Sequence, residues 1–221
     1  MKLQFSDMAR YLEASDIIDF GYREVADLAF EIMAYSEDDI SYIRNAYEYV
    51  RDNISHSADI QGSTVTCKAS EVLRAKEGIC YAKSHLLAAL LRCNKIPTGF
   101  CYQRLILDDD TAPFLIIHGL NAVYIENFNK WIRLDARGNK VGVNAQFLLE
   151  REQLAFPVRI EKGEEDILTI FAHSDENVIN ALTKNRNLEA LWVNLPTKLY
   201  TTTVRKGESN KLLKEHWGNT D

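Results

Sequence analysis

The chain has 221 residues, of which 46% are hydrophobic and 26% are charged, a balance typical of one substantial folded core and not of a disordered chain. The formal net charge is −6, so we expect neither nucleic acid nor an anionic membrane as a partner. The N-terminus lacks the apolar run of a signal peptide, and no stretch approaches the roughly 18 apolar residues of a spanning helix. These features predict a soluble, cytoplasmic protein.

Two amphipathic helices are predicted in the first quarter of the chain. Apolar residues recur at helical spacing over residues 22–33 and again over 36–51. Ser36 and Asp39 have the spacing of a capping box at the start of the second helix. Residues 1–18 have no clear period and are expected to be extended. A polar loop over 53–68 and a short helix from Ser70 are expected to follow.

The strongest helix prediction covers residues 80–93, which contain no proline or glycine and carry leucines at helical spacing. Cys80 opens this helix, where the positive end of the peptide dipoles favours a thiolate. Gly78 lacks a Cβ and would let another segment approach the sulfur. A packed core thiol is the alternative for Cys80. It is the preferred interpretation for Cys67, Cys93 and Cys101, which form no CxxC pair, so neither structural zinc nor disulfides are expected.

Three strands with short links are predicted after this helix. Alternating patterns cover 100–107 and 114–126, and a further strand covers 130–135, which together imply an antiparallel sheet. The first link contains the aspartates 108–110, which lack the spacing of a calcium loop. We therefore expect a solvated turn there and not a cation site.

His118 lies on the second of these strands and Asp135 on the third. If the link is tight, with Glu126 opposite Asn129, then Asp135 lies opposite Leu120 and one diagonal step from His118 on the same face. A looser link would separate the two side chains. In the alternative interpretation, His118 is an ordinary half-buried strand residue and Asp135 begins a turn.

A cysteine at a helix start, a histidine on a strand and an aspartate on the next strand together suggest a nucleophile, its base and an orienting group. The imidazole would accept the thiol proton, and the carboxylate would fix the imidazole tautomer. His85, one helical turn after Cys80, is a rival base, although its position is expected to direct it along the helix surface.

The sequence around these residues resembles the transglutaminase-like superfamily over roughly residues 40–140, in the same order of cysteine, histidine and aspartate. The resemblance implies an α+β fold with a papain-like core, in which the cysteine-bearing helix packs on an antiparallel sheet. It also implies that Cys80 is the nucleophile, His118 the general base and acid, and Asp135 the orienting residue in thioester chemistry on amides. The matching segments are 49–54, 69–73, 78–80, 86–92, 96–97, 118 with 122–125, and 131–135.

Two departures from the family pattern lie beside the triad. Gly119 follows the histidine where aromatic residues are usual, and Ala136 follows the aspartate where proline is common. Both leave the triad intact and leave the substrate and the acyl acceptor open. The calcium-site regions of animal transglutaminases have no counterpart, so no metal and no cofactor are expected.

Further site residues are candidates only. The backbone N–H of Cys80 and the side chain of Gln103 are the candidate donors to an oxyanion. Tyr81, Tyr102 and Asn121 are candidates for lining the cleft. For each of these side chains, ordinary structural packing is the alternative.

The resemblance fades after residue 139. The pattern predicts a turn that leads into a short helix within 144–151, an edge strand over 154–160 and a charged turn over 162–166. It also predicts helices from Ser174 and over 188–192, and a polar tail after Thr201. This pattern predicts a catalytic domain over residues 1–160, including the N-terminal helices, and a small helical extension of the same domain over 161–221.

These features favour a thiol-dependent amide hydrolase, of the cysteine peptidase or amidase kind, acting on a peptide or protein. Hydrolysis is preferred because water needs no binding site of its own. Transglutaminase-type acyl transfer to an amine is the rival enzyme function. A catalytically silent peptide-binding module is the alternative from another class. The oligomeric state is left open.

Overall fold

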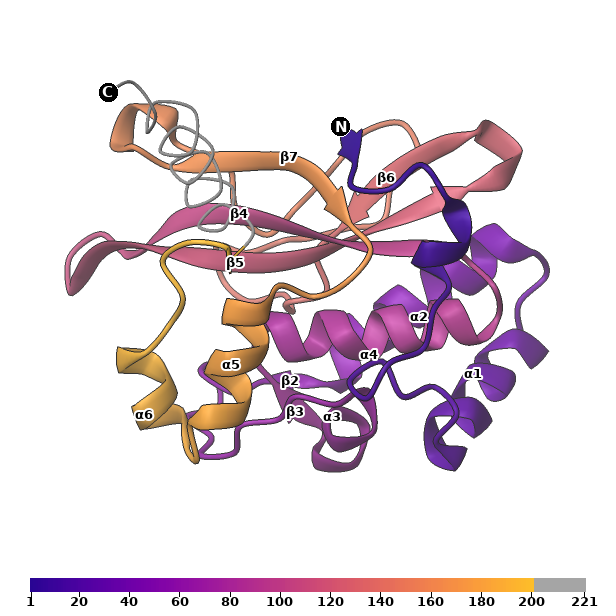
Figure 1. Ribbon diagram of the computed structural model, residues 1–221, viewed down its shortest axis with the longest axis horizontal. Helices are drawn as coiled ribbons and strands as arrows, with labels where there is room; N and C mark the ends of the chain where they lie inside the picture. Colours follow the sequence, from indigo (N-terminus) through magenta and orange to yellow (C-terminus); the bar gives the residue numbers. More distant parts are fainter. Residues whose placement is uncertain (201–221) are drawn as a thin grey trace, which may run out of the picture.

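A twisted sheet of five strands forms the centre of the fold in the computed structural model, which describes residues 1–200 (Figure 1). In order across the sheet, the strands are β1 (Lys2–Leu3), β7 (Glu165–Phe171), β4 (Thr98–Asp108), β5 (Ala112–Ile125) and β6 (Lys130–Leu134). Strands β4, β5 and β6 pair antiparallel, as the alternating pattern predicts. β7 pairs antiparallel with the outer side of β4, and β1 pairs parallel with β7.

Helices cover one face of this sheet, and α4 (Cys80–Cys93) is central among them (Figure 1). The helices α1 (Arg23–Ala34), α2 (Asp39–Asn53) and α3 (Ala69–Ala75) each contact α4. The helices α5 (Glu176–Lys184) and α6 (Leu188–Val193) lie towards the tip of the β4–β5 hairpin. The α+β fold with a helix that starts at Cys80 is therefore confirmed. The remaining elements are the parallel pair β2 (Ser55–His56) and β3 (Glu77–Gly78) and the 3-10 helices Met8–Tyr11, Glu126–Phe128 and Ile160–Lys162.

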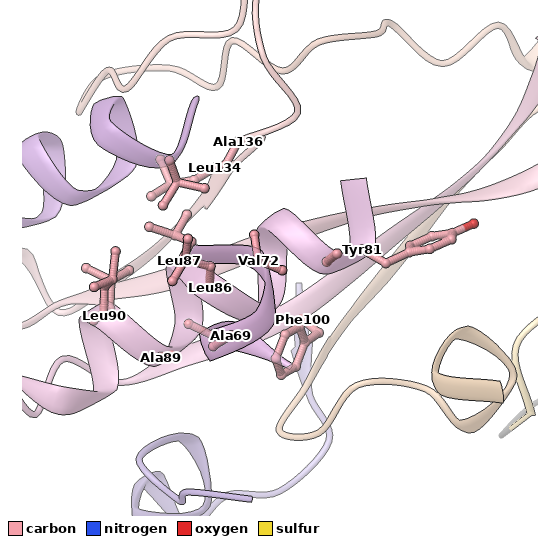
Figure 2. Packing of buried hydrophobic residues seen from close by; sticks show 14 of the residues in the cluster. Ala69, Val72, Tyr81, Leu86, Leu87, Ala89, Leu90, Phe100, Leu134 and Ala136 are labelled. Atoms are coloured by element: carbon pink, nitrogen blue, oxygen red, sulfur yellow. The ribbon is translucent and has the colours of Figure 1, made fainter. Parts of the chain in front are cut away.

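The hydrophobic core lies mainly between α4 and the sheet. Figure 2 shows Leu86, Leu87 and Leu90 of α4 in one cluster with Val72 of α3 and Leu134 of β6. These leucines are fully buried, and burial of each contributes roughly 1.5–3 kcal/mol, so α4 is held firmly in place. A smaller cluster on the other face of the sheet contains Tyr11, Cys101, Leu120, Ala122, Ile170 and Ala172.

The register of the β5–β6 pair agrees with a tight link. Ile125 lies opposite Lys130 and Asn121 opposite Leu134, which continues to place Asp135 opposite Leu120. β6 ends at Leu134, so the edge of β5 beyond this point is free of β6. There the backbone N–H of Ile117 donates to the carbonyl of Pro196 at 2.7 Å. The segment after α6 therefore covers part of this edge.

The start of α2 differs from the prediction. Its N-cap is Asp38, which forms a capping box with Ser41. Ser36 instead donates its hydroxyl to the carbonyl of Ile32 at 2.7 Å, so it belongs to the end of α1. The helix predicted from Ser36 thus begins at Asp39, because aspartate and serine three residues apart satisfy the first free N–H groups better.

The chain after residue 139 differs more. The helix predicted over 144–151 is wrong, because Asn139 accepts from the N–H of Ala145 at 2.7 Å and donates to its carbonyl at 3.1 Å. The strand predicted over 154–160 is also wrong: Pro157 cannot donate to a ladder, and the N–H of Ala155 donates to Asp135. Instead, β7 joins the central sheet, so the segment after residue 160 is not only helical.

The helices predicted near the C-terminus are confirmed as α5 and α6, with Asp175 as the N-cap of α5. The predicted polar tail after Thr201 lies outside the described residues. No helix among residues 1–200 has the length and apolar character that crossing a bilayer requires.

Candidate active site

Cys80 is the first residue of α4 and is 8% exposed. The short pair of β2 and β3 brings the chain to this point, because β3 ends at Gly78 and Ile79 is the helix N-cap. N–H groups in the first turn of a helix have no intrahelical acceptor, and they carry the positive end of its dipole. The sulfur therefore lies where negative charge is stabilised.

His118 of β5 and Asp135 form a buried pair. The Nε2 atom of His118 lies 2.8 Å from Oδ2 of Asp135, which leaves Nδ1 as the ring nitrogen available to the thiol. The same carboxylate accepts from the N–H of Ala155 at 3.1 Å and from the N–H of Arg137 at 3.2 Å. Asp135 is thus held on three sides and can fix the orientation of the imidazole.

The charges of this group support one another. Burial opposes the charged form of His118, but the carboxylate of Asp135 and the sulfur of Cys80 outweigh it and raise the pKa of His118 to about 10. Burial likewise opposes ionisation of Asp135, but the charge of His118 and the hydrogen bonds to the carboxylate lower its pKa below the ordinary value. A protonated imidazole beside an ionised carboxylate is therefore the stable state.

The other cysteines have a different environment. Burial raises the pKa of Cys67 and of Cys101 to about 12, and it also raises the pKa of Cys93. These thiols stay protonated near neutral pH, which agrees with the packed core thiols expected for them.

Cys80 and His118 both line a cleft of about 610 Å³. One wall is apolar and includes Leu105, Leu107 and Ile116 of the β4–β5 hairpin, together with Trp192 and Leu195 from the C-terminal segment. Polar residues also line the cleft. One group, called the polar wall, includes His56, Asp59, Arg137 and Lys140, and a second group includes Asp109, Arg159 and Glu164.

The charged side chains of the cleft are already paired. Arg137 forms two hydrogen bonds with Asp59, at 2.6 and 2.8 Å, and Lys140 lies 2.7 Å from the same carboxylate. Arg159 forms ion pairs with Glu164 and Asp109. These contacts hold the charged side chains of the cleft in place.

The structure separates the three predicted cleft residues. Tyr81 lines the cleft, and its hydroxyl donates to the carbonyl of Ile117. Tyr102 and Asn121 are not among the residues that line the cleft. The hydroxyl of Tyr102 accepts from the N–H of Asp175 at 2.8 Å, and the amide of Asn121 donates to the carbonyl of Ser84 at 3.1 Å. Both are tied to the core beneath the sheet.

Two further predictions are affected by the geometry. Gln103 lies directly opposite His118 in the β4–β5 ladder but is not among the residues that line the cleft, so its function as an oxyanion donor stays a prediction. His85 is buried in α4 and does not lie along the helix surface. Its Nδ1 atom is 2.7 Å from the carbonyl of Cys67 and its Nε2 atom 2.8 Å from Ser174 Oγ, so both nitrogens have partners away from Cys80.

Two polar residues beside the site were missed in the sequence. His56 falls in the stretch predicted as a loop, but it forms β2 and reaches the cleft through the pairing of β2 with β3. Lys83 lies within the leucine-rich helix and is fully buried. A lysine three residues after Cys80 on an otherwise apolar helix was the available signal.

The sequence profile of the transglutaminase-like superfamily matches residues 26–136. This match covers the cysteine helix, the histidine strand and the aspartate, and the chain therefore belongs to the transglutaminase-like superfamily. No curated protein matches the sequence.

Two solved structures are similar in part. A candidate cysteine protease from Cytophaga hutchinsonii aligns with a TM-score of 0.49 and 22% identity over 60% of this chain and 43% of its own. A candidate protease from Parabacteroides distasonis aligns with a TM-score of 0.40 and 16% identity over 62% of this chain and 26% of its own. The chain thus spans less than half of either protein.

Proposed function

We propose that this protein is a thiol-dependent amide hydrolase that cleaves a peptide or protein through a thioester on Cys80. The proposal is carried by one observation: the buried pair of His118 and Asp135 lies beside a cysteine at a helix N-terminus, in an open cleft. A structural histidine–aspartate pair would not need a thiol beside it or access to a ligand.

In the first half of the reaction, the thiolate of Cys80 attacks the amide carbonyl carbon. A carbon–sulfur bond forms, and the π electrons of the carbonyl move to its oxygen. The oxyanion then collapses and the carbon–nitrogen bond breaks, while the imidazolium of His118 gives its proton to the leaving amine. The products are a free amine, a thioester and a neutral imidazole.

In the second half, neutral His118 accepts a proton from water as the water oxygen attacks the thioester carbon. Collapse of this second oxyanion breaks the carbon–sulfur bond. The acid product leaves, and the thiolate and imidazolium are restored. Asp135 keeps its charge throughout and orients the imidazole.

The proposal is tested by the pH dependence of Cys80 alkylation with iodoacetamide, followed by mass spectrometry of the peptide that contains Cys80. We expect Cys80 to be alkylated faster than a free thiol in weakly acidic solution, because the imidazolium of His118 stabilises the thiolate. His118→Ala should lose this reactivity, whereas His173→Ala, which changes a half-exposed histidine on another part of the surface, should keep it. A parent Cys80 that reacts no faster than a free thiol at any pH tested would favour the silent binding module.

Hydrolysis and acyl transfer are separated by a second assay. The protein is incubated with a glutamine-containing peptide library and monodansylcadaverine, and the products are resolved by mass. We expect Cys80-dependent peptide or amide cleavage in water. Cys80-dependent incorporation of the labelled amine in preference to cleavage would replace hydrolysis by transfer.

A further inference from the structure

His56 lies on the polar wall of the cleft that also contains Cys80 and His118. It is opposite Gly78 in the β2–β3 pair, two residues before Cys80, so the backbone of the nucleophile segment fixes its place. The mechanism above gives this imidazole no task. His56 is thus held by a strand pair in the same cleft as Cys80, and its place there needs a functional explanation.

One ring nitrogen of His56, the buried Nδ1 atom, has no hydrogen-bond partner among the described residues. Burial, together with the positive charges of Arg137, Lys83 and His118, outweighs the attraction of Asp59 and lowers the pKa of His56 to about 3. The ring is thus neutral at physiological pH, with one N–H donor. Buried polar groups without partners are rare and commonly mark a functional site.

Other polar side chains of the polar wall are already engaged. The guanidinium of Arg137 is bound to both oxygens of Asp59, and Lys140 contacts the same carboxylate. The hydroxyl of Tyr81 donates to a backbone carbonyl. Each would have to break an existing contact to reach a substrate oxygen, whereas the imidazole of His56 would not.

We propose that His56 donates a hydrogen bond to the oxygen of the scissile carbonyl as it becomes negatively charged, together with the backbone N–H of Cys80. This inference rests on the proposed function. The imidazole keeps its proton, so no covalent bond changes at His56. A neutral donor suits this place, because a second cation beside the imidazolium of His118 would be repelled. A hydrogen bond from this donor stabilises the oxyanion, so it speeds up only reactions in which an oxyanion forms.

Two small probes separate this function from an effect on the thiol. Acylation of Cys80 by p-nitrophenyl acetate passes through an oxyanion, and its single-turnover rate is read from p-nitrophenolate release. Alkylation by iodoacetamide displaces iodide at a saturated carbon and forms no oxyanion. We expect His56→Ala to lower the acylation rate by at least about tenfold and to leave the alkylation rate and its pH profile within about twofold.

Three variants make the result specific. His56→Gln, which keeps an N–H donor, should recover part of the acylation rate, whereas His56→Phe should not. Gln103→Ala, on the rival donor that is not among the residues lining the cleft, should behave as the parent. An unchanged acylation rate in His56→Ala, an equal fall in both rates, or a loss in Gln103→Ala alone would overturn the inference. Failure of the proposed function has a different signature, namely a parent Cys80 that reacts with neither probe faster than a free thiol.

Discussion

Asp135 is the residue whose charge the site depends on most directly. Its carboxylate accepts three hydrogen bonds and holds the pKa of His118 near 10. Asp135→Asn keeps the shape but removes the charge, so the pKa of His118 falls and less imidazolium is present to stabilise the thiolate. We expect the rate of Cys80 alkylation at pH 7 to fall by at least about tenfold, measured with iodoacetamide.

A matched control for this change is Asp175→Asn. Asp175 is also a buried aspartate, but it caps α5 by accepting from the N–H of Asn177, and asparagine caps helices about equally well. This variant should keep the parent alkylation rate. If both variants lose reactivity equally, the effect is on the fold and not on the charge beside His118.

Lys83 joins α4 to two other segments at once. Its ammonium donates to the carbonyls of Arg51 at 3.2 Å, Ile54 at 2.5 Å and Arg137 at 2.9 Å. The first two carbonyls lie at the end of α2, and the third belongs to the loop that follows Asp135. Burial lowers the pKa of Lys83 to about 7, but three N–H donors facing three carbonyls match the charged form. The side chain of Lys83 thus links α4, which begins at Cys80, to the loop that follows Asp135.

Replacing this lysine should cost stability. In Lys83→Met the methyl end fills the space but leaves three inward-facing carbonyls without a donor, so we expect the free energy of unfolding to fall by about 3 kcal/mol in urea titrations. Lys184→Met, on the exposed end of α5, should change it by less than about 0.5 kcal/mol. A Lys83→Met chain as stable as the parent would mean that dehydrating the ammonium costs as much as its bonds contribute.

For the whole molecule, buried histidines predict an acid-sensitive fold. Burial lowers the pKa of His85 to about 4 and that of His56 to about 3. Below pH 6.5 these two histidines bind protons in the unfolded chain but stay neutral in the folded protein. The free energy of unfolding therefore falls as the pH drops towards 4. His118 has the opposite sign: its folded pKa is raised, so its contribution is full below 6.5 and is lost as the pH rises through 10.

The test compares unfolding free energies at pH 7 and pH 5. We expect the parent to lose stability between these values, with about 2 kcal/mol of the loss due to His85. In His85→Gln, the difference between the two pH values should shrink by that amount, whatever the change at pH 7. His173→Gln, at a half-exposed histidine, should alter the difference less. An unchanged difference in His85→Gln would contradict the assignment.

Much of the fold could be predicted because its signals are local. The leucines of α4 show a buried helix, and the short link between β5 and β6 fixes the register that brings Asp135 to His118. β7 was missed because its polar residues hide the alternation. Asp166, for example, points to Arg133 of β6 and forms an ion pair with it at 2.5 Å. The partner of such a polar residue lies on another strand, far away in the sequence, so the local pattern does not show that the residue belongs to a strand.

The same limit applies to the site. Cys80, His118 and Asp135 carry recognisable patterns on their own elements. His56 has none, because its neighbours are polar and its place depends on β3, which lies on the far side of the intervening helix α3 along the chain. Such a residue is found only when the pairing is known.

The pairing of β1 with β7 bears on how the protein is made. Lys2 and Leu3 lie beside Thr169 and Ile170, and the hydroxyl of Tyr11 donates to the carbonyl of Ile170. On the ribosome, the first residues of the chain emerge long before their partners exist. Helices α1 to α4 and the antiparallel strands β4, β5 and β6 can assemble in the meantime, but β1 and β7 can pair only after residue 170 has emerged, which makes this pairing a late step of co-translational folding.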